Sequence, residues 1–177
     1  VTSTLDRATG EEEIETASSN AAKQDNISSA RILQALETMF ADDAERSGNV
    51  LQIETEDAPL MGDPVTVLRI LANFISNAIS HAPGSTISLC LVKESHAQVF
   101  EVRDTGPGMS PQSLALCKER RHGTLNGSSK GGDNRGLGLS IVEDLTRSAG
   151  FHWSIESSVG IGTRASLHIP MAEHVHP

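Results

Sequence analysis

The fold is decided by the stretch Leu68-Arg69-Ile70-Leu71-Ala72-Asn73-Phe74-Ile75-Ser76-Asn77-Ala78-Ile79-Ser80-His81. Apolar residues recur in it at helical spacing, which predicts a helix with one buried face. The predicted buried stripe is Leu68, Leu71, Ile75, Ala78 and Ile79. The opposite side carries Arg69, Asn73, Ser76, Asn77 and Ser80, with Ile70 and Phe74 as apolar exceptions.

The polar side of this helix is unusual in its residue types. A solvated helix face normally carries Glu and Lys, which are good helix formers, whereas Asn and Ser compete for backbone hydrogen bonds. Asn73 and Asn77 are four residues apart, so they lie one turn apart on the same side. The face either holds a polar ligand or lines a wet crevice, and this segment alone leaves both interpretations open.

The chain has 177 residues and a formal net charge of −9. That length suits one domain, and the negative charge argues against general binding to nucleic acid or to anionic lipid. The two cysteines, Cys90 and Cys117, have neither metal-binding nor redox spacing. No apolar run approaches the roughly 20 residues that span a bilayer, so we expect no direct membrane contact by this domain.

We expect three parts along the chain. Residues 1–28 are polar and acidic, which predicts a poorly ordered linker or the end of an upstream region. Residues 29–170 form the predicted domain, and residues 171–177 form a tail. The first residue is Val rather than Met, which indicates a piece of a longer protein. The sequence leaves open whether that parent is anchored in a membrane.

Within the domain, predicted helices alternate with short strands. Helices are expected over residues 29–45, 64–81, 112–117 and 136–149, and strands over 50–55, 86–93, 98–103, 152–157 and 163–169. Asp63 is the expected N-cap of the central helix, with Pro64 at its first position. This order predicts an α+β fold, a two-layer sandwich of a mixed, mostly antiparallel sheet with helices on one face.

Two glycine-bearing turns stand beside predicted elements. Asp104-Thr105-Gly106-Pro107-Gly108-Met109 follows a strand, and Gly136-Leu137-Gly138-Leu139-Ser140 opens a helix. Neither fits a phosphate-loop or a dinucleotide-binding pattern. Gly136 and Gly138 nevertheless leave N–H groups uncovered at a helix N-terminus, where anions are favoured. Asp104 is either an ordinary turn-initiating residue or an acceptor for an exocyclic amine.

The segment 118–135 is rich in glycine and in positive charge. It is expected to be a loop, and a loop of this length inside a compact domain is either functional or disordered. Five of the 14 Lys and Arg residues of the chain fall in it: Lys118, Arg120, Arg121, Lys130 and Arg135. An inert flexible loop would not need this basic bias.

Four motifs in this order resemble the ATP-binding domain of sensor histidine kinases, gyrase and mismatch-repair proteins, the Bergerat fold. Residues 73–78 resemble the N box, 104–109 the G1 box and 136–142 the G2 box. The run Gly160-Ile161-Gly162-Thr163, with the following strand, is similar to the end of histidine kinase catalytic domains. The resemblance covers about residues 29–170 and implies binding of ATP and Mg²⁺.

The resemblance also implies roles for single residues. Asn77 would bind Mg²⁺ with Asn73 beside it, Asp104 would accept from the adenine amine, and Thr163 would contact the base edge. Residues 118–135 would form a lid over the ATP. The full set implied to bind the nucleotide is Asn73, Asn77, Ser80, His81, Asp104, Gly106, Gly108, Met109, Lys130, Arg135, Gly136, Leu137, Gly138, Leu139 and Thr163.

The sequence departs from the family pattern at some positions. Ser80 and His81 stand where many histidine kinases have Lys and Tyr, and no aromatic F box is evident between the G1 and G2 boxes. ATP-hydrolysing members carry Glu at the position of Asn73. Because an amide cannot take a proton from water, we expect poor hydrolysis and favour transfer to a protein side chain.

The implied function is transfer of the γ-phosphoryl group of Mg-ATP to a histidine on a separate dimerisation element. No histidine of this chain lies on a helix beside an acid, so we expect the acceptor on helices before residue 1. The implied partners are those helices and a response regulator, in a homodimeric parent whose catalytic part is cytoplasmic. A nucleotide-sensing module without transfer activity and a serine kinase acting on an anti-sigma antagonist remain as alternatives.

Overall fold

The computed structural model describes residues 27–54, 56–121 and 137–171, and gives the backbone alone at 120, 121 and 137. The elements are α2 (Ser29–Arg46), β1 (Val50–Ile53), α3 (Pro64–His81), β2 (Thr86–Lys93), β3 (Ala97–Asp104), α4 (Pro111–Arg121), α5 (Leu137–Ala149), β4 (His152–Ser158) and β5 (Gly162–Pro170). Predicted features within residues 1–26, 122–136 and 172–177 lie outside this description.

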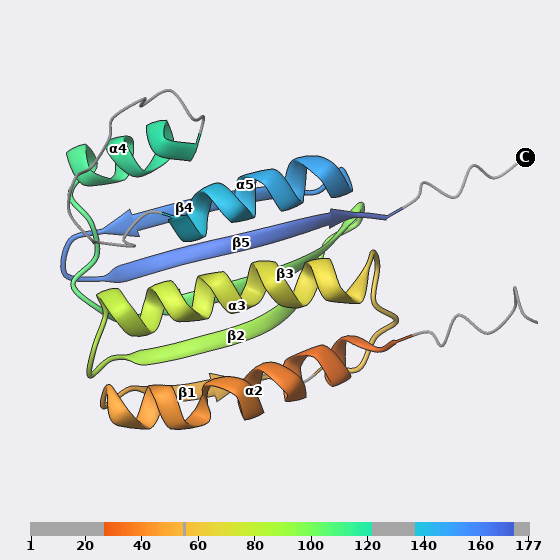
Figure 1. Ribbon diagram of the computed structural model, residues 1–177, viewed down its shortest axis with the longest axis horizontal. Coiled ribbons are helices and arrows are strands. Elements are labelled where there is room, and N and C mark those ends of the chain that lie inside the picture. The colour runs from red at the N-terminus through yellow and green to blue at the C-terminus, as the bar shows by residue number, and fades with distance from the viewer. Residues whose placement is uncertain (1–26, 55, 122–136, 172–177) are drawn as a thin grey trace, which may run out of the picture.

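One sheet organises the domain. Its strand order is β1-β2-β3-β5-β4, with β1 and β2 parallel and the other neighbours antiparallel. Helices α2, α3 and α5 lie across one face of the sheet, while α4 stands beside α5 and β4 (Figure 1). The predicted α+β sandwich with a mixed, mostly antiparallel sheet is confirmed.

Helix α3 lies in the middle of the helical layer and begins where the sequence predicts. The Asp63 side chain accepts hydrogen bonds from the Thr66 N–H at 2.8 Å and the Thr66 hydroxyl at 2.7 Å. These bonds favour the charged form and lower the pKa of Asp63. Pro64 occupies the first turn, where a missing N–H costs nothing.

The buried face of α3 is wider than predicted, and the treatment of Ile70 and Phe74 as exceptions on the polar side was wrong. Both are buried, whereas Leu68 and Ile79 are only partly buried. The reason is tertiary, because α3 packs on the sheet below and on α2 and α5 at its sides. Its buried residues are Val67, Ile70, Leu71, Phe74, Ile75 and Ala78.

Two other boundaries differ from the prediction by more than one residue. Helix α4 continues through residues 118–121, which were expected to open the basic loop. Lys, Glu and Arg are good helix formers, so this run extends the helix even without an apolar stripe. Strand β1 ends at Ile53, although the Glu54 N–H still donates to the Leu89 carbonyl at 2.9 Å.

The alternation of the strands decides which side chains face the helices. In β3 the residues Phe100 and Val102 are buried under the helical layer, so Asp104 points to the same side. In β5 the buried residues Ala165 and Leu167 follow Thr163 at every second position, so Thr163 also points toward the helices. The ends of β3 and β5 therefore present polar side chains toward the helices.

Candidate functional site

Asp104 ends β3 directly opposite Thr163 of β5. Its Oδ1 accepts from the Gly106 N–H at 2.9 Å and from the Thr163 N–H at 3.3 Å. Its Oδ2 makes no hydrogen bond with any described residue. One carboxylate oxygen thus anchors the side chain while the other remains available as an acceptor.

The turn after Asp104 depends on close backbone approaches. At Gly162, with φ +127°, a Cβ would lie 1.9 Å from the Asp104 carbonyl oxygen, and at Gly108, with φ +68°, it would lie 2.0 Å from the Ser158 carbonyl oxygen. At Gly106 a Cβ would lie 2.3 Å from the Cβ of Ala82, which follows α3. Glycine is therefore required where the turn meets the β4–β5 hairpin and the end of α3.

Ser157 joins β4 and β5 to the turn that follows β3. Its hydroxyl accepts from the Met109 N–H at 2.8 Å, lies 3.0 Å from the Gly162 carbonyl oxygen and 2.9 Å from the Thr163 hydroxyl. Sequence reasoning did not select Ser157, and it named Gly162 only as part of the run Gly160-Ile161-Gly162-Thr163. The signal for Ser157 was a small polar residue that follows Trp153 and Ile155 at inward-facing positions of one strand.

The other end of the site lies between α3 and α5. A Cβ at Gly138 would lie 3.2 Å from Asn73 Oδ1 and 3.3 Å from Asn77 Oδ1, so the backbone of α5 lies directly against both amides. The Asn73 amide nitrogen donates to the Arg69 carbonyl oxygen at 2.8 Å. Among the described residues the Asn77 amide makes no hydrogen bond.

This arrangement suits a hard cation better than a soft one. In the described part of the chain, no group of three or more His, Cys, Asp or Glu could hold a metal ion. A free amide oxygen such as that of Asn77 is, however, a ligand of the class that Mg²⁺ accepts. Mg²⁺ keeps several waters and commonly takes one or two protein oxygens together with substrate phosphates.

The remaining predicted residues lie in different places. Met109 and Leu139 pack partly buried against the core, beside the two ends of the site. Ser80 lines a hollow of about 290 Å³ that α3 shares with α2, and His81 is exposed in the last turn. Lys130, Arg135 and Gly136 lie outside the described residues, as does the side chain of Leu137.

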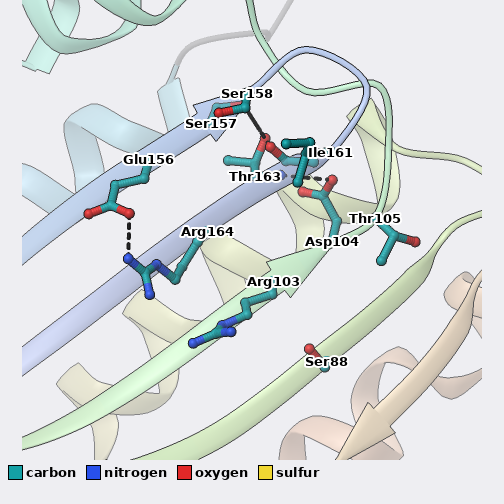
Figure 2. A pocket seen from close by; sticks show the side chains of 11 residues that line it. Ser88, Arg103, Asp104, Thr105, Glu156, Ser157, Ser158, Ile161, Thr163 and Arg164 are labelled. Carbon is teal, nitrogen blue, oxygen red and sulfur yellow. Dashed lines mark hydrogen bonds and ion pairs between the residues drawn. The ribbon is translucent and has the colours of Figure 1, made fainter.

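A second hollow of about 370 Å³ lies at the ends of the strands, and Figure 2 shows its lining. It includes Asp104 and Thr163 but extends over the sheet face away from the helices, where Glu156 pairs with Arg164. That hydrogen bond raises the pKa of Arg164. Asn73 and Asn77 do not line this hollow, so it is separate from the contact between α3 and α5.

The uncovered sheet face also contains a cysteine. Cys90 of β2 is half-buried and lies opposite Glu101 of the neighbouring strand β3. Burial raises the pKa of the Cys90 thiol, and the charge of Glu101 raises it further. A thiol held in its protonated form suits packing rather than nucleophilic chemistry.

Comparison with known proteins gives consistent matches. The profile of the histidine kinase-, DNA gyrase B-, and HSP90-like ATPases matches residues 62–173. The circadian input-output histidine kinase CikA of Synechococcus elongatus is 32% identical over 130 residues, which are 72% of this chain and 17% of CikA. The sensor protein IrlS of Burkholderia pseudomallei is 29% identical over 160 residues, which are 84% of this chain and 34% of IrlS. The chain therefore spans about a third or less of the length of these relatives.

Solved structures share the fold. The catalytic domain of histidine kinase ThkA superposes with a TM-score of 0.65 at 18% identity, covering 81% of this chain and 94% of that one. Full-length ShkA in complex with AMPPNP gives a TM-score of 0.67 at 21% identity, covering 82% of this chain and 30% of that one. In the described residues no helix is long and apolar enough to cross a membrane.

Proposed function

This chain belongs to the family of histidine kinase-, DNA gyrase B-, and HSP90-like ATPases, and we propose that it is the ATP-binding catalytic domain of a sensor histidine kinase. One observation carries the proposal. Helix α3 borders Gly138 of α5 through Asn73 and Asn77, and its end borders Gly106 of the Asp104 turn. The Asp104 carboxylate and the N-terminus of α5 thus both lie beside α3. This arrangement gives a nucleotide one place for its base and another for its phosphates.

The base would bind at the Asp104 end. The free Oδ2 accepts from the 6-amino group of adenine, while the bonds from Gly106 and Thr163 hold the carboxylate in place. A charge-assisted hydrogen bond of this kind is stronger than a neutral one. Because the carboxylate is anchored before the ligand arrives, little conformational entropy is lost on binding.

The phosphates would bind at the N-terminus of α5. The peptide dipoles favour negative charge there, and Gly138 carries no side chain that would keep phosphate away from the backbone. Mg²⁺, held through the Asn77 amide oxygen, would neutralise the phosphate charge when bound. This compensation is needed because the chain carries a net charge of −9.

Phosphoryl transfer rather than hydrolysis is supported by Asn73. Its amide nitrogen is committed to the Arg69 carbonyl, and an amide has no basicity to activate water at neutral pH. The protein would position the nucleotide in line with an incoming histidine and neutralise charge. That histidine would come from the parent's own upstream dimerisation helices, with a response regulator as the next acceptor.

Binding can be tested by calorimetry with Mg-ATP on the chain as it stands. Asp104→Asn keeps the shape but replaces an acceptor by a group that also donates, so we expect affinity for Mg-ATP to fall at least about tenfold. Asp42→Asn, an exposed change on α2, is the matched control and should bind as the wild type does. Equal affinity of wild type and Asp104→Asn would refute the base site as described.

Transfer is tested by joining the chain to its upstream helices and supplying Mg-ATP. A kinase of this class forms acid-labile phosphate on a histidine. Nucleotide binding without any phosphoprotein would instead indicate a nucleotide-sensing module. This is the second candidate function, because Ser80 and His81 replace the Lys and Tyr of many histidine kinases. Acid-stable phosphate on serine would indicate a serine kinase.

A further inference from the structure

We infer that Ser157 determines the base specificity of this site by making the Thr163 hydroxyl a hydrogen-bond acceptor toward the ligand. The inference rests on the proposed nucleotide site and concerns a residue outside the four motifs. The structure supports it by the contacts of one hydroxyl. Ser157 Oγ has three partners, namely the Met109 N–H, the Gly162 carbonyl and the Thr163 hydroxyl.

Counting protons fixes the direction of these bonds. A serine hydroxyl has one proton to donate and two lone pairs to accept with. The Met109 N–H can only donate, so it uses one lone pair. The Gly162 carbonyl can only accept, so it takes the Ser157 proton across 3.0 Å. The contact of 2.9 Å with Thr163 is then made only if Thr163 donates to Ser157.

The opposite direction leaves a contact unmade. If Ser157 donated to Thr163, the Gly162 carbonyl would lie 3.0 Å from an oxygen that offers it no proton. An unmade bond at a half-buried polar group is unfavourable. The arrangement with Thr163 as donor to Ser157 satisfies all three contacts and is therefore favoured.

The ligand then meets a corner that offers acceptors only. The Thr163 proton is used within the protein, so its hydroxyl offers a ligand only lone pairs, on a residue whose backbone N–H binds Asp104 Oδ1. The 6-amino group of adenine carries two protons and matches two acceptors. Guanine carries an oxygen at that position, which two acceptors repel. Selection against guanine thus depends on Ser157, although Ser157 itself need not touch the base.

A purely structural role for Ser157 predicts a different result. If Ser157 only tied Met109 to β5, its loss would loosen the corner and weaken all nucleotides alike. The ratio of ATP to GTP affinity separates the two roles, because a general loosening does not move it. Competition of ATP and GTP, each with Mg²⁺, against a fluorescent ATP analogue measures both affinities.

The test uses Ser157→Ala. Without Ser157 Oγ the Thr163 proton is free to turn outward and can donate to the guanine oxygen. We expect GTP to bind more tightly relative to ATP, with the selectivity ratio lowered by about tenfold. Adding Thr163→Val removes the freed donor, so GTP should bind more weakly to the double variant than to Ser157→Ala. Ser154→Ala, on the same strand and facing the other side of the sheet, should keep the wild-type ratio.

Two results would overturn the inference. One is an unchanged ATP to GTP ratio in Ser157→Ala, and the other is a double variant that tolerates GTP as well as the single one does. If Ser157→Ala does not fold, Thr163→Val alone decides. It should weaken ATP and strengthen GTP, because the wild-type hydroxyl accepts from the 6-amino group of adenine and repels the oxygen of guanine. Failure of the wild type to bind Mg-ATP would instead refute the proposed function.

Discussion

Replacement of Gly138 by alanine should raise stability and weaken Mg-ATP binding, and these opposite signs make it a sharp test of the phosphate end. The new methyl group would lie 3.2 Å from Asn73 Oδ1 and 3.3 Å from Asn77 Oδ1, which requires shifts of a few tenths of an ångström. The two amides do not resist equally. Asn73 is tied to the Arg69 carbonyl, whereas Asn77 has no hydrogen bond among the described residues. Asn77, the proposed Mg²⁺ ligand, should therefore move.

The magnitudes follow from these contacts. Alanine is favoured over glycine in a helix by up to about 1 kcal/mol, which raises Tm by roughly 2–4 °C in a chain of this size. The close contact subtracts part of this gain without reversing it, because a free amide can turn. Disturbing the support of a metal ligand commonly costs about tenfold or more in affinity. We expect Mg-ATP affinity to fall by about that factor, with a higher Mg²⁺ concentration needed for half-saturation.

The assay combines thermal unfolding with calorimetry of ATP at several Mg²⁺ concentrations. Gly150→Ala, at the other end of α5, is the matched control, since its φ is +70° and no atom lies within 4 Å of the added Cβ. It should lower Tm through backbone strain and leave ATP binding unchanged. If Gly138→Ala bound Mg-ATP with wild-type affinity and Mg²⁺ dependence, the metal and phosphates could not lie where α5 meets α3.

Two further predictions concern the elements that support the site. Asp63→Ala removes the cap of α3 and should lower stability by about 1 kcal/mol. Because the bonds from Thr66 lower the pKa of Asp63, the Tm difference from the wild type should be full at neutral pH and shrink as pH falls below about 4. Trp153→Phe keeps an aromatic ring beside Phe74 but loses the 2.9 Å bond to Glu143, and should cost about 1–3 kcal/mol in denaturant unfolding. An unchanged midpoint would show that this bond does not hold α5.

The sequence predicts best what is determined locally. The start of α3 follows from Asp63 and Pro64, whose effect needs only the next few residues. The alternation of buried and partly exposed residues in β2 is local in the same sense. So is the end of α5 at Gly150, a glycine with positive φ. The N, G1 and G2 motifs are short, so their residues could be named without knowing how the segments meet.

What the sequence misses depends on contacts between distant segments. Phe74 is buried because Trp153 lies beside it with ring centroids 6.0 Å apart, and no helical periodicity can reveal a partner on β4. Ser157 matters because it meets Met109, which is 48 residues earlier in the chain. Its place after Trp153 and Ile155 marks it only as a small polar residue that faces inward, and its role cannot be inferred until that contact is known.

The two ends of the site are built differently, and this difference bears on how the protein works. At the base end, Asp104, Ser157 and Thr163 are fixed by hydrogen bonds between strands, so the corner has one shape before the ligand arrives. At the phosphate end, Asn77 meets the backbone of α5 without a hydrogen bond from any described residue. The position of α5 rests in part on the bond from Trp153 to Glu143. In the proposed binding mode, recognition of the base is therefore preorganised, whereas alignment of the phosphates depends on how α3 and α5 pack. A signal from the rest of the proposed parent protein would have the most effect on transfer at that helix contact.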